Sequence, residues 1–218
     1  DQGLVFQSKS GDWLNAIDRC QALLETTTST LHELNEILLR TELGELPIEI
    51  TSLIGNRDNC AAIAERAGLP FHHIEMDGDL REQGFRQIRD LLVAQDVELI
   101  VLARFMQILP NDFCQEFSGK IINIHHSFLP AFIGANPYKQ AHERGVKLIG
   151  ATCHYVTADL DAGPIIEQEV ERVSHFHSPT DLARLGRHCE RIALAKGIRY
   201  HVHDRTLIDG HRAIVFPD

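Results

Sequence analysis

The sequence predicts an α/β fold built on a doubly wound, mostly parallel β-sheet, followed by a long C-terminal helix and a β-hairpin. Three observations lead to this prediction. Strand-like apolar runs alternate with helical patterns through the first half of the chain, as in βαβ units. The run Val97–Leu102 is almost entirely apolar, which is typical of a strand buried on both faces of a parallel sheet. Near the end of the chain, Asp209-Gly210 between two short apolar runs is typical of a hairpin.

Each predicted element rests on a local pattern. Apolar runs of strand length predict strands over Cys20–Leu24, Ile48–Ile54, Phe71–Ile74, Val97–Leu102, Ile121–His125, Leu148–Tyr155 and Pro164–Val173. Apolar residues at helical spacing predict helices over Leu31–Gly44, Asp58–Ala67, Asp79–Gln95, Asn111–Phe117, Pro137–Arg144 and Thr180–Asp204. The hairpin strands are predicted over Thr206–Ile208 and Arg212–Phe216. We expect residues 1–19 to be an N-terminal segment that is a remnant of a regulatory domain, and residues 20–218 to form one domain.

Composition argues against several classes of protein. The formal charge of −10 over 218 residues disfavours nucleic acid as a partner. No apolar run reaches the roughly 18 residues of a membrane helix and no signal peptide opens the chain, so we expect a cytoplasmic protein without membrane contact. The five cysteines are scattered, which is typical of structural thiols in a reducing compartment. The 13 histidines form no zinc-binding pattern, so we expect no metal site.

The first predicted strand and helix lack the glycines of a phosphate-binding loop. No glycine occurs between Cys20 and Thr41. A backbone cradle for phosphate at a helix N-terminus usually needs glycine for close approach. A nucleotide-binding Rossmann protein is therefore disfavoured, although the predicted sheet is of a similar kind.

The stretch Ile121–Gly134 begins as a strand, ends as a loop and holds the candidate site. Because successive side chains of a strand alternate between faces, Asn123 and His125 share one face. The same rule places His126 away from that face. The pair stands at the carboxyl end of an apolar strand, which is where open α/β sheets bind their ligands.

A carboxylate, Asp161, precedes the next apolar strand and a Gly163-Pro164 turn. Taken alone, Asp161 reads as a turn former. If it converges with Asn123 and His125, the three groups can stabilise an oxyanion and move protons. His154 lies on an apolar strand, and the residues leave open whether it supports this site or only fills the core. Ser127 lacks the G-x-S-x-G context of a nucleophile, so we interpret it as a loop-structuring hydroxyl.

With these motifs, the sequence resembles the formyltransferase-fold enzymes that act on 10-formyltetrahydrofolate, and among them the formyltetrahydrofolate deformylases. The resemblance covers about Leu34–Phe216 and rests on five segments: Gly44–Ile50, Ile122–Pro130, Gly134–Ala141, Arg144–Thr152 and Tyr155–Gln168. His126 and Phe128 match the deformylase form. The glycinamide ribonucleotide transformylases usually carry Pro and Leu at these two positions.

The resemblance implies a formyltransferase-type, Rossmann-like fold and hydrolysis of 10-formyltetrahydrofolate to formate and tetrahydrofolate. This reaction supplies formate for purine synthesis and balances one-carbon folate pools. By resemblance, Asn123, His125 and Asp161 are the catalytic residues, with His154 and Ser127 supporting them. Folate would be bound as substrate, with no prosthetic group, by Leu102, Arg104, Phe105, Met106, Gly134, Val156 and Asp159.

Two other functions stay open. The first alternative is a phosphoribosylglycinamide formyltransferase, and the second is a folate-binding homologue without catalysis. The second is suggested by Thr28-Ser29 and His32-Glu33-Leu34, which differ from the Ser-Lys and His-Cys-Leu of the family. It is also suggested by the expected lack of most or all of the N-terminal ACT regulatory domain. In every case we expect a homo-oligomer.

Overall fold

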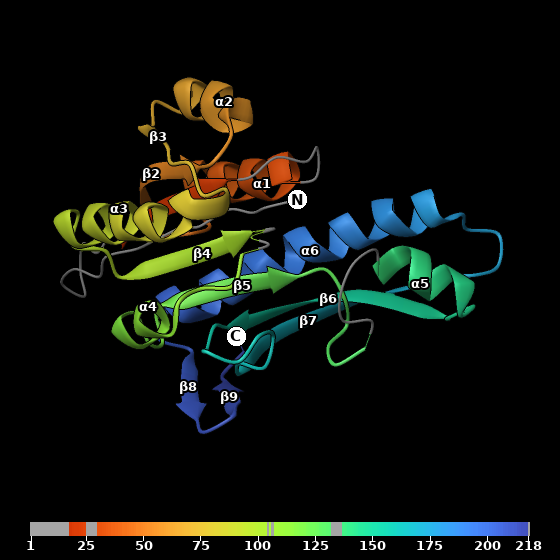
Figure 1. Cartoon of the computed structure of the whole chain (residues 1–218). Helices are drawn as coiled ribbons and strands as arrows, with labels where there is room; N and C mark the ends of the chain where they lie inside the picture. The colour runs from red at the N-terminus through yellow and green to blue at the C-terminus, as the bar shows by residue number, and fades with distance from the viewer. Residues whose placement is uncertain (1–17, 25–29, 104, 106, 132–136, 218) are drawn as a thin grey trace.

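The computed structural model describes residues 18–24, 30–103, 105, 107–131 and 137–217 (Figure 1). The main sheet is formed by β1 (Asp18–Leu24), β2 (Ile48–Gly55), β3 (Phe71–His73), β4 (Leu99–Ala103), β5 (Ile121–His125), β6 (Leu148–Tyr155) and β7 (Ile165–Arg172). The helices are α1 (Thr30–Glu42), α2 (Ala61–Arg66), α3 (Arg81–Ala94), α4 (Asn111–Glu116), α5 (Pro137–Glu143) and α6 (Pro179–Val202). A separate hairpin pairs β8 (Thr206–Asp209) with β9 (Arg212–Val215).

The sheet has the strand order β3-β2-β1-β4-β5-β6-β7. Strands β1 to β5 are parallel, while β6 is antiparallel to β5 and β7 is antiparallel to β6. Strand β1 pairs with both β2 and β4, so the direction in which the chain adds strands reverses there. The prediction of a mostly parallel α/β sheet with a long C-terminal helix and a hairpin is confirmed.

Most of the predicted boundaries differ from the observed ones by only a few residues. Strand β1 starts two residues before the predicted Cys20, and β4 starts two residues after the predicted Val97. The turn before β4 contains Asp96, whose φ of 51° is left-handed and incompatible with a strand. Two predicted helices open with a single 3₁₀ turn, over Asp58–Cys60 and Gly78–Leu80.

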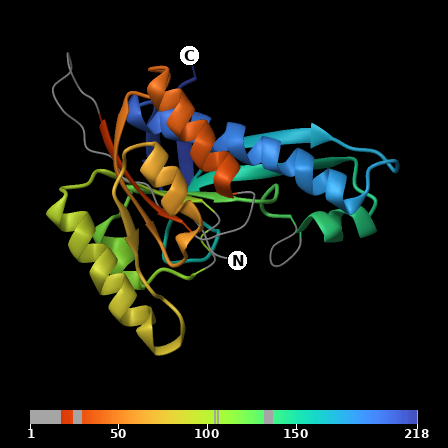
Figure 2. The ribbon, with the colours of Figure 1, turned by 90° about the horizontal axis from the view of Figure 1, so that it is seen from above.

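Helices cover both faces of the sheet, which makes the fold doubly wound (Figure 2). On one face α3 and α4 pack through Phe85, Ile88, Leu92 and Phe113 against strand residues such as Ile100. On the other face α1, α2 and α6 enclose a second apolar core. The strands therefore lie between two layers of helices, and their carboxyl ends remain the edge at which polar side chains gather.

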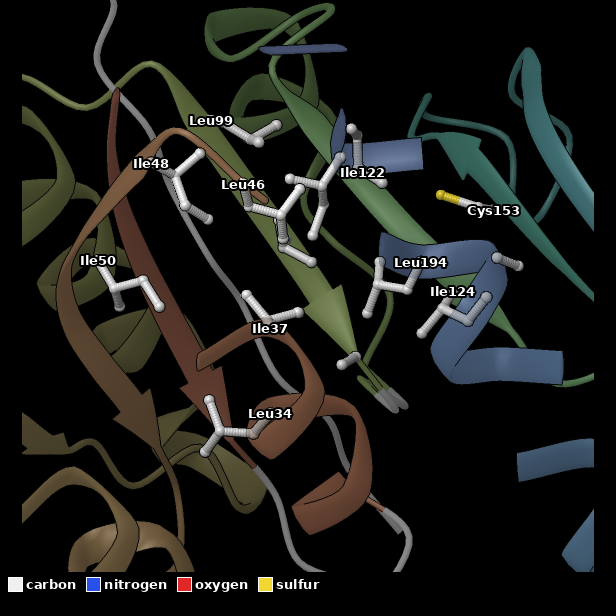
Figure 3. Packing of buried hydrophobic residues seen from close by; sticks show 14 of the residues in the cluster. Leu34, Ile37, Leu46, Ile48, Ile50, Leu99, Ile122, Ile124, Cys153 and Leu194 are labelled. Carbon is white, nitrogen blue, oxygen red and sulfur yellow. The ribbon is translucent and has the colours of Figure 1, made fainter. Parts of the chain in front are cut away.

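Strand β5 contributes to both cores. Ile122 and Ile124 lie in the core beneath α1 and α6, where Ile124 is near Leu194 of α6 (Figure 3). Ile121 lies in the core beneath α3 and α4. The predicted alternation therefore holds within the strand, and it places Asn123 on the same side of the sheet as Ile121.

Helix α6 is the longest helix of the described part and packs against β6 and β7. It begins with a capping box: the Ser178 hydroxyl accepts a hydrogen bond from the Asp181 N–H at 3.2 Å, and the Asp181 carboxylate accepts one from the Ser178 N–H at 3.0 Å. Pro179 follows the cap, where its missing N–H costs nothing. None of the helices described is long and apolar enough to cross a membrane.

Candidate active site

Strands β5 and β6 hold an amide and an imidazole next to each other. Asn123 and His154 are direct partners in the antiparallel ladder, so their side chains share a face. Asn123 Nδ2 lies 3.2 Å from His154 Nε2, and His154 Nδ1 lies 2.8 Å from the Tyr155 carbonyl oxygen. Because a carbonyl only accepts, His154 carries its proton on Nδ1, and its Nε2 accepts from Asn123.

This pairing fixes the orientation of the Asn123 amide. Burial lowers the pKa of His154, so the ring is neutral at pH 7 and Nε2 keeps its lone pair. The amide NH₂ group must then face His154. One of its two protons is used in that contact, and the other remains to donate to a bound group.

His125 and Asp161 form a second pair. His125 Nδ1 lies 3.3 Å from Asp161 Oδ2, with side-chain exposures of 9% and 13%. Burial opposes ionisation of Asp161. The hydrogen bond from His125 and the charges of His125, His154 and His126 outweigh burial, so the pKa of Asp161 is lowered. The carboxylate is therefore ionised at neutral pH.

Asp161 also lies near the amide pair, since its Oδ1 is 3.7 Å from His154 Nε2. The four side chains from β5, β6 and the loop after β6 thus form one cluster. Within the described part of the chain, the Nε2 atom of His125 is buried without a hydrogen-bond partner. Buried polar atoms are normally paired, so this nitrogen is available to a bound group or a water molecule.

The turn that carries Asp161 depends on a glycine. Asp161 has a φ of 52°, a left-handed conformation that aspartate tolerates better than most residues. Two residues later, a Cβ on Gly163 would lie 1.7 Å from the Tyr155 carbonyl oxygen. The Tyr155 N–H in turn donates to the Pro164 carbonyl at 2.9 Å. Only glycine lets the loop approach β6 this closely.

Hydrogen bonds also hold the loop after β5. Ser127 donates its hydroxyl to the Ala131 carbonyl at 2.8 Å. The Thr152 hydroxyl donates to the Ser127 carbonyl at 2.9 Å and accepts from the Leu129 N–H at 3.0 Å. Gln168 donates to both the Leu129 carbonyl and the Thr152 hydroxyl. Sequence reasoning missed Thr152 and Gln168, although for Thr152 a buried polar residue within an apolar strand is a signal of such a role.

A pocket opens beside this cluster. Asn123, His154 and Asp161 contribute to its wall, while His125 contacts Asp161 and is not part of the lining. The remaining lining comes from the segment that follows β4 and the loop that follows β6: Leu102, Phe105, Gln107, Ile108, Leu109, Val156, Thr157, Ala158, Asp159 and Leu160. The pocket therefore joins polar groups at one end to mostly apolar walls, an arrangement typical of small-molecule sites.

Four of the seven predicted folate contacts line this pocket: Leu102, Phe105, Val156 and Asp159. The other three, Arg104, Met106 and Gly134, lie outside the described residues. The sequence analysis missed the stretch 107–109. These residues could have been predicted from the path of the chain, because the segment between β4 and α4 has to cross the carboxyl edge of the sheet, where ligands bind.

The His126 ring lies close to the His125 ring, with the two centroids 5.2 Å apart. Strand β5 ends at His125, so the alternation of faces does not extend to His126, and its placement off the face of Asn123 stays a prediction. On its other side, the His126 ring is 6.4 Å from the Tyr138 ring of α5.

The cluster combines an oriented amide donor, an imidazole with one unpaired nitrogen and an ionised carboxylate. Such a set can stabilise negative charge on a carbonyl oxygen and transfer protons at the same carbon. Across the residues with described positions, no group of three or more His, Cys, Asp or Glu side chains is arranged to hold a metal ion.

Comparison with known proteins agrees with this geometry. The family profile described as formyl transferase matches residues 23–198, which is most of the chain. The chain belongs to the formyl transferase family. The match includes every strand of the main sheet except most of β1, and it includes the whole Asn123, His125, His154 and Asp161 cluster.

Individual relatives are named for two activities. The chain is 50% identical over 186 residues to the formyltetrahydrofolate deformylase of Bacillus subtilis, covering 85% of this chain and 62% of the relative. A crystal structure of a formyltetrahydrofolate deformylase from Pseudomonas syringae pv. tomato has a TM-score of 0.83 and 46% identity, covering 85% of this chain and 62% of that one. A glycinamide ribonucleotide transformylase structure from Symbiobacterium toebii has a TM-score of 0.82 and 31% identity, covering 89% and 92%.

Proposed function

We propose that the protein hydrolyses 10-formyltetrahydrofolate to formate and tetrahydrofolate. The observation that carries this proposal is that Asn123 and Asp161 line one pocket while His125 contacts Asp161. The comparisons favour hydrolysis over transfer: deformylase structures are 37–46% identical to the chain, and transformylase structures are 25–32% identical. The chain spans 62% of the length of the Bacillus subtilis deformylase, so the activity of that whole protein is proposed here rather than assigned.

Asn123 acts on the oxyanion in the proposed reaction. Attack of water on the formyl carbon places negative charge on the formyl oxygen. The amide proton of Asn123 that does not contact His154 donates to this oxygen. Removal of one such donor in an oxyanion site typically costs about 3–4 kcal/mol of transition-state stabilisation.

His125 and Asp161 move the protons. Ionised Asp161 accepts a hydrogen bond from the attacking water and directs it at the carbon, while His125 holds the carboxylate in place through Nδ1. A proton then reaches N10 of the folate as the C–N bond breaks. The balanced reaction at neutral pH is R₂N–CHO + H₂O → R₂NH + HCOO⁻ + H⁺.

The pocket provides the binding site for the folate in this proposal. A pteridine is a flat ring with donors and acceptors along its edge, which suits apolar walls with backbone groups between them. Leu102, Phe105, Val156 and Asp159 would contact the ring, and we keep Arg104, Met106 and Gly134 as further proposed contacts. Tetrahydrofolate leaves by the same pocket, and the reaction calls for no prosthetic group.

The decisive experiment is formate release from 10-formyltetrahydrofolate in the absence of any acceptor. We expect steady release that glycinamide ribonucleotide does not accelerate. Asn123→Ala provides the inactive control. Acceptor-dependent formyl transfer would instead support the transformylase alternative, which is favoured by the 92% coverage of the Symbiobacterium toebii enzyme. Folate binding with no turnover would support the non-catalytic homologue.

We also propose that the protein is a cytoplasmic homo-oligomer. The cysteines with described environments, Cys60, Cys114, Cys153 and Cys189, are free and buried, which suits a reducing compartment. Sedimentation of the purified protein tests the oligomer, and fractionation of the source cells tests the compartment. A monomer, or a protein found in the membrane or medium, would contradict these proposals.

A further inference from the structure

The geometry around His125 points to a second histidine that takes part in turnover. His125 is only 7% exposed, and Asp161 occupies its Nδ1. His126 is more exposed than His125 and follows it directly, with the two ring centroids 5.2 Å apart. Proton transfer through one bridging water molecule is feasible between rings this close.

Hydrolysis requires an exit for protons. This step rests on the proposed function. In each turnover a C–O bond forms from water and the C–N10 bond breaks. One water proton ends on N10, which stays a neutral amine because it is attached to an aromatic ring. Formate leaves as an anion, so the second proton remains on the His125–Asp161 pair and has to reach bulk water before the next cycle.

In the proposed reaction the folate fills the pocket that Asp161 lines, which makes the groups around His125 a route for this proton. His154 is unsuitable, because burial lowers its pKa and both ring nitrogens are engaged. On the α5 side, the Tyr138 hydroxyl donates to Glu190 of α6 at 2.6 Å. The Tyr138 ring is packed so tightly against α6 that a Cβ on Gly186 would lie 2.1 Å from it. Tyr138 and Glu190 therefore form a fixed wall beside His126.

We propose that His126 passes the released proton from His125 to bulk water. The electrostatics agree with this role: the charge of His126 is among the causes that lower the pKa of Asp161, after the larger effects of burial, His125 and His154. His126 acts through His125 and does not touch the substrate. It is therefore a proton-exchange residue, and its loss slows regeneration of the site.

Buffer dependence separates this role from packing. In weak buffer we expect His126→Gln and His126→Phe to lower kcat about 10-fold with little change in the folate KM. The Phe variant keeps the aromatic ring and so preserves contacts with Tyr138. Added imidazole should restore both variants to near the unaltered rate. The control is His142→Gln, an exposed histidine of α5, which should behave as the unaltered protein does at every buffer concentration.

Three results would decide against the inference. Unchanged kcat in both His126 variants would exclude proton exchange as a slow step. A loss of kcat that imidazole does not restore, in variants with unaltered thermal stability, would assign His126 to site geometry instead. If the unaltered protein releases no formate, the proposed hydrolysis fails and the inference with it, so the two failures are distinguishable.

Discussion

Replacing Gly163 with alanine tests how tightly the 160–164 turn is coupled to the catalytic groups. The new Cβ would lie 1.7 Å from the Tyr155 carbonyl oxygen and 2.8 Å from its carbon, both backbone atoms that cannot rotate away. Overpacking of this kind costs about 1–3 kcal/mol. For a domain of about 150–250 residues, that cost lowers Tm by about 2–12 °C.

The same substitution should damage catalysis beyond its effect on stability. The Tyr155 carbonyl accepts the Nδ1 proton of His154 at 2.8 Å, and His154 orients Asn123. Displacing this carbonyl, or the turn itself, moves Asn123 or Asp161 away from the substrate. A displacement of about 1 Å can cost about 100-fold in rate, so we expect kcat to fall about 100-fold at a temperature where the variant is folded.

Two assays and one matched variant separate the effects. Thermal unfolding followed by circular dichroism gives the loss of stability, and formate release gives kcat. Gly68→Ala is the control: Gly68 has a left-handed φ of 67°, so alanine strains the backbone there, but it has open space around it and no place in the site. It should lose stability and keep kcat. A Gly163→Ala protein that is folded and turns over normally would refute the coupling of this turn to the site.

The remaining predictions concern single side chains. Asn123→Ala and Asp161→Asn should each lower kcat by about 100-fold or more with folate affinity changed much less; near-normal turnover in either would contradict its role. His154→Phe keeps a buried ring but loses both hydrogen bonds, so the Asn123 amide can rotate and kcat should fall about 10-fold; an unchanged kcat would show that the amide is oriented by other groups. Burial lowers the pKa of His201 to about 4, so the unfolded chain binds this proton more readily than the folded one. The associated stability is complete above about pH 6.5 and is lost as the pH falls toward 4, by on the order of 2 kcal/mol. Urea unfolding at pH 7 and pH 4.5 should show a smaller loss for His201→Gln than for the unaltered protein, and equal losses would refute the assignment.

Much of the fold was predictable because its determinants are local. Alternating faces, helical spacing and turn residues act over a few positions, so the elements were found with only small errors at their ends. The α6 boundary shows the limit of such patterns: the capping box of Ser178 and Asp181 places its start one residue before the predicted Thr180. The order of the strands could not be predicted from such local patterns, because the pairing of β1 with β4 depends on contacts between distant segments.

The candidate site, too, was predictable in part from local patterns and in part only from the tertiary structure. The sequence alone placed Asn123 and His125 on one face of a strand, because alternation is a property of the backbone. It left His154 open, and the register of β5 against β6 decided that this histidine faces Asn123.

Only the tertiary structure brought Asp161 to within 3.3 Å of His125, because that contact requires a turn tight enough to need Gly163. It also showed that the His126 ring lies 5.2 Å from the His125 ring, just past the end of β5, where local alternation no longer applies. The residue types of the site could thus be recognised from local sequence. Their spatial proximity depended on the register of the strands, on where β5 ends and on one close approach of the backbone.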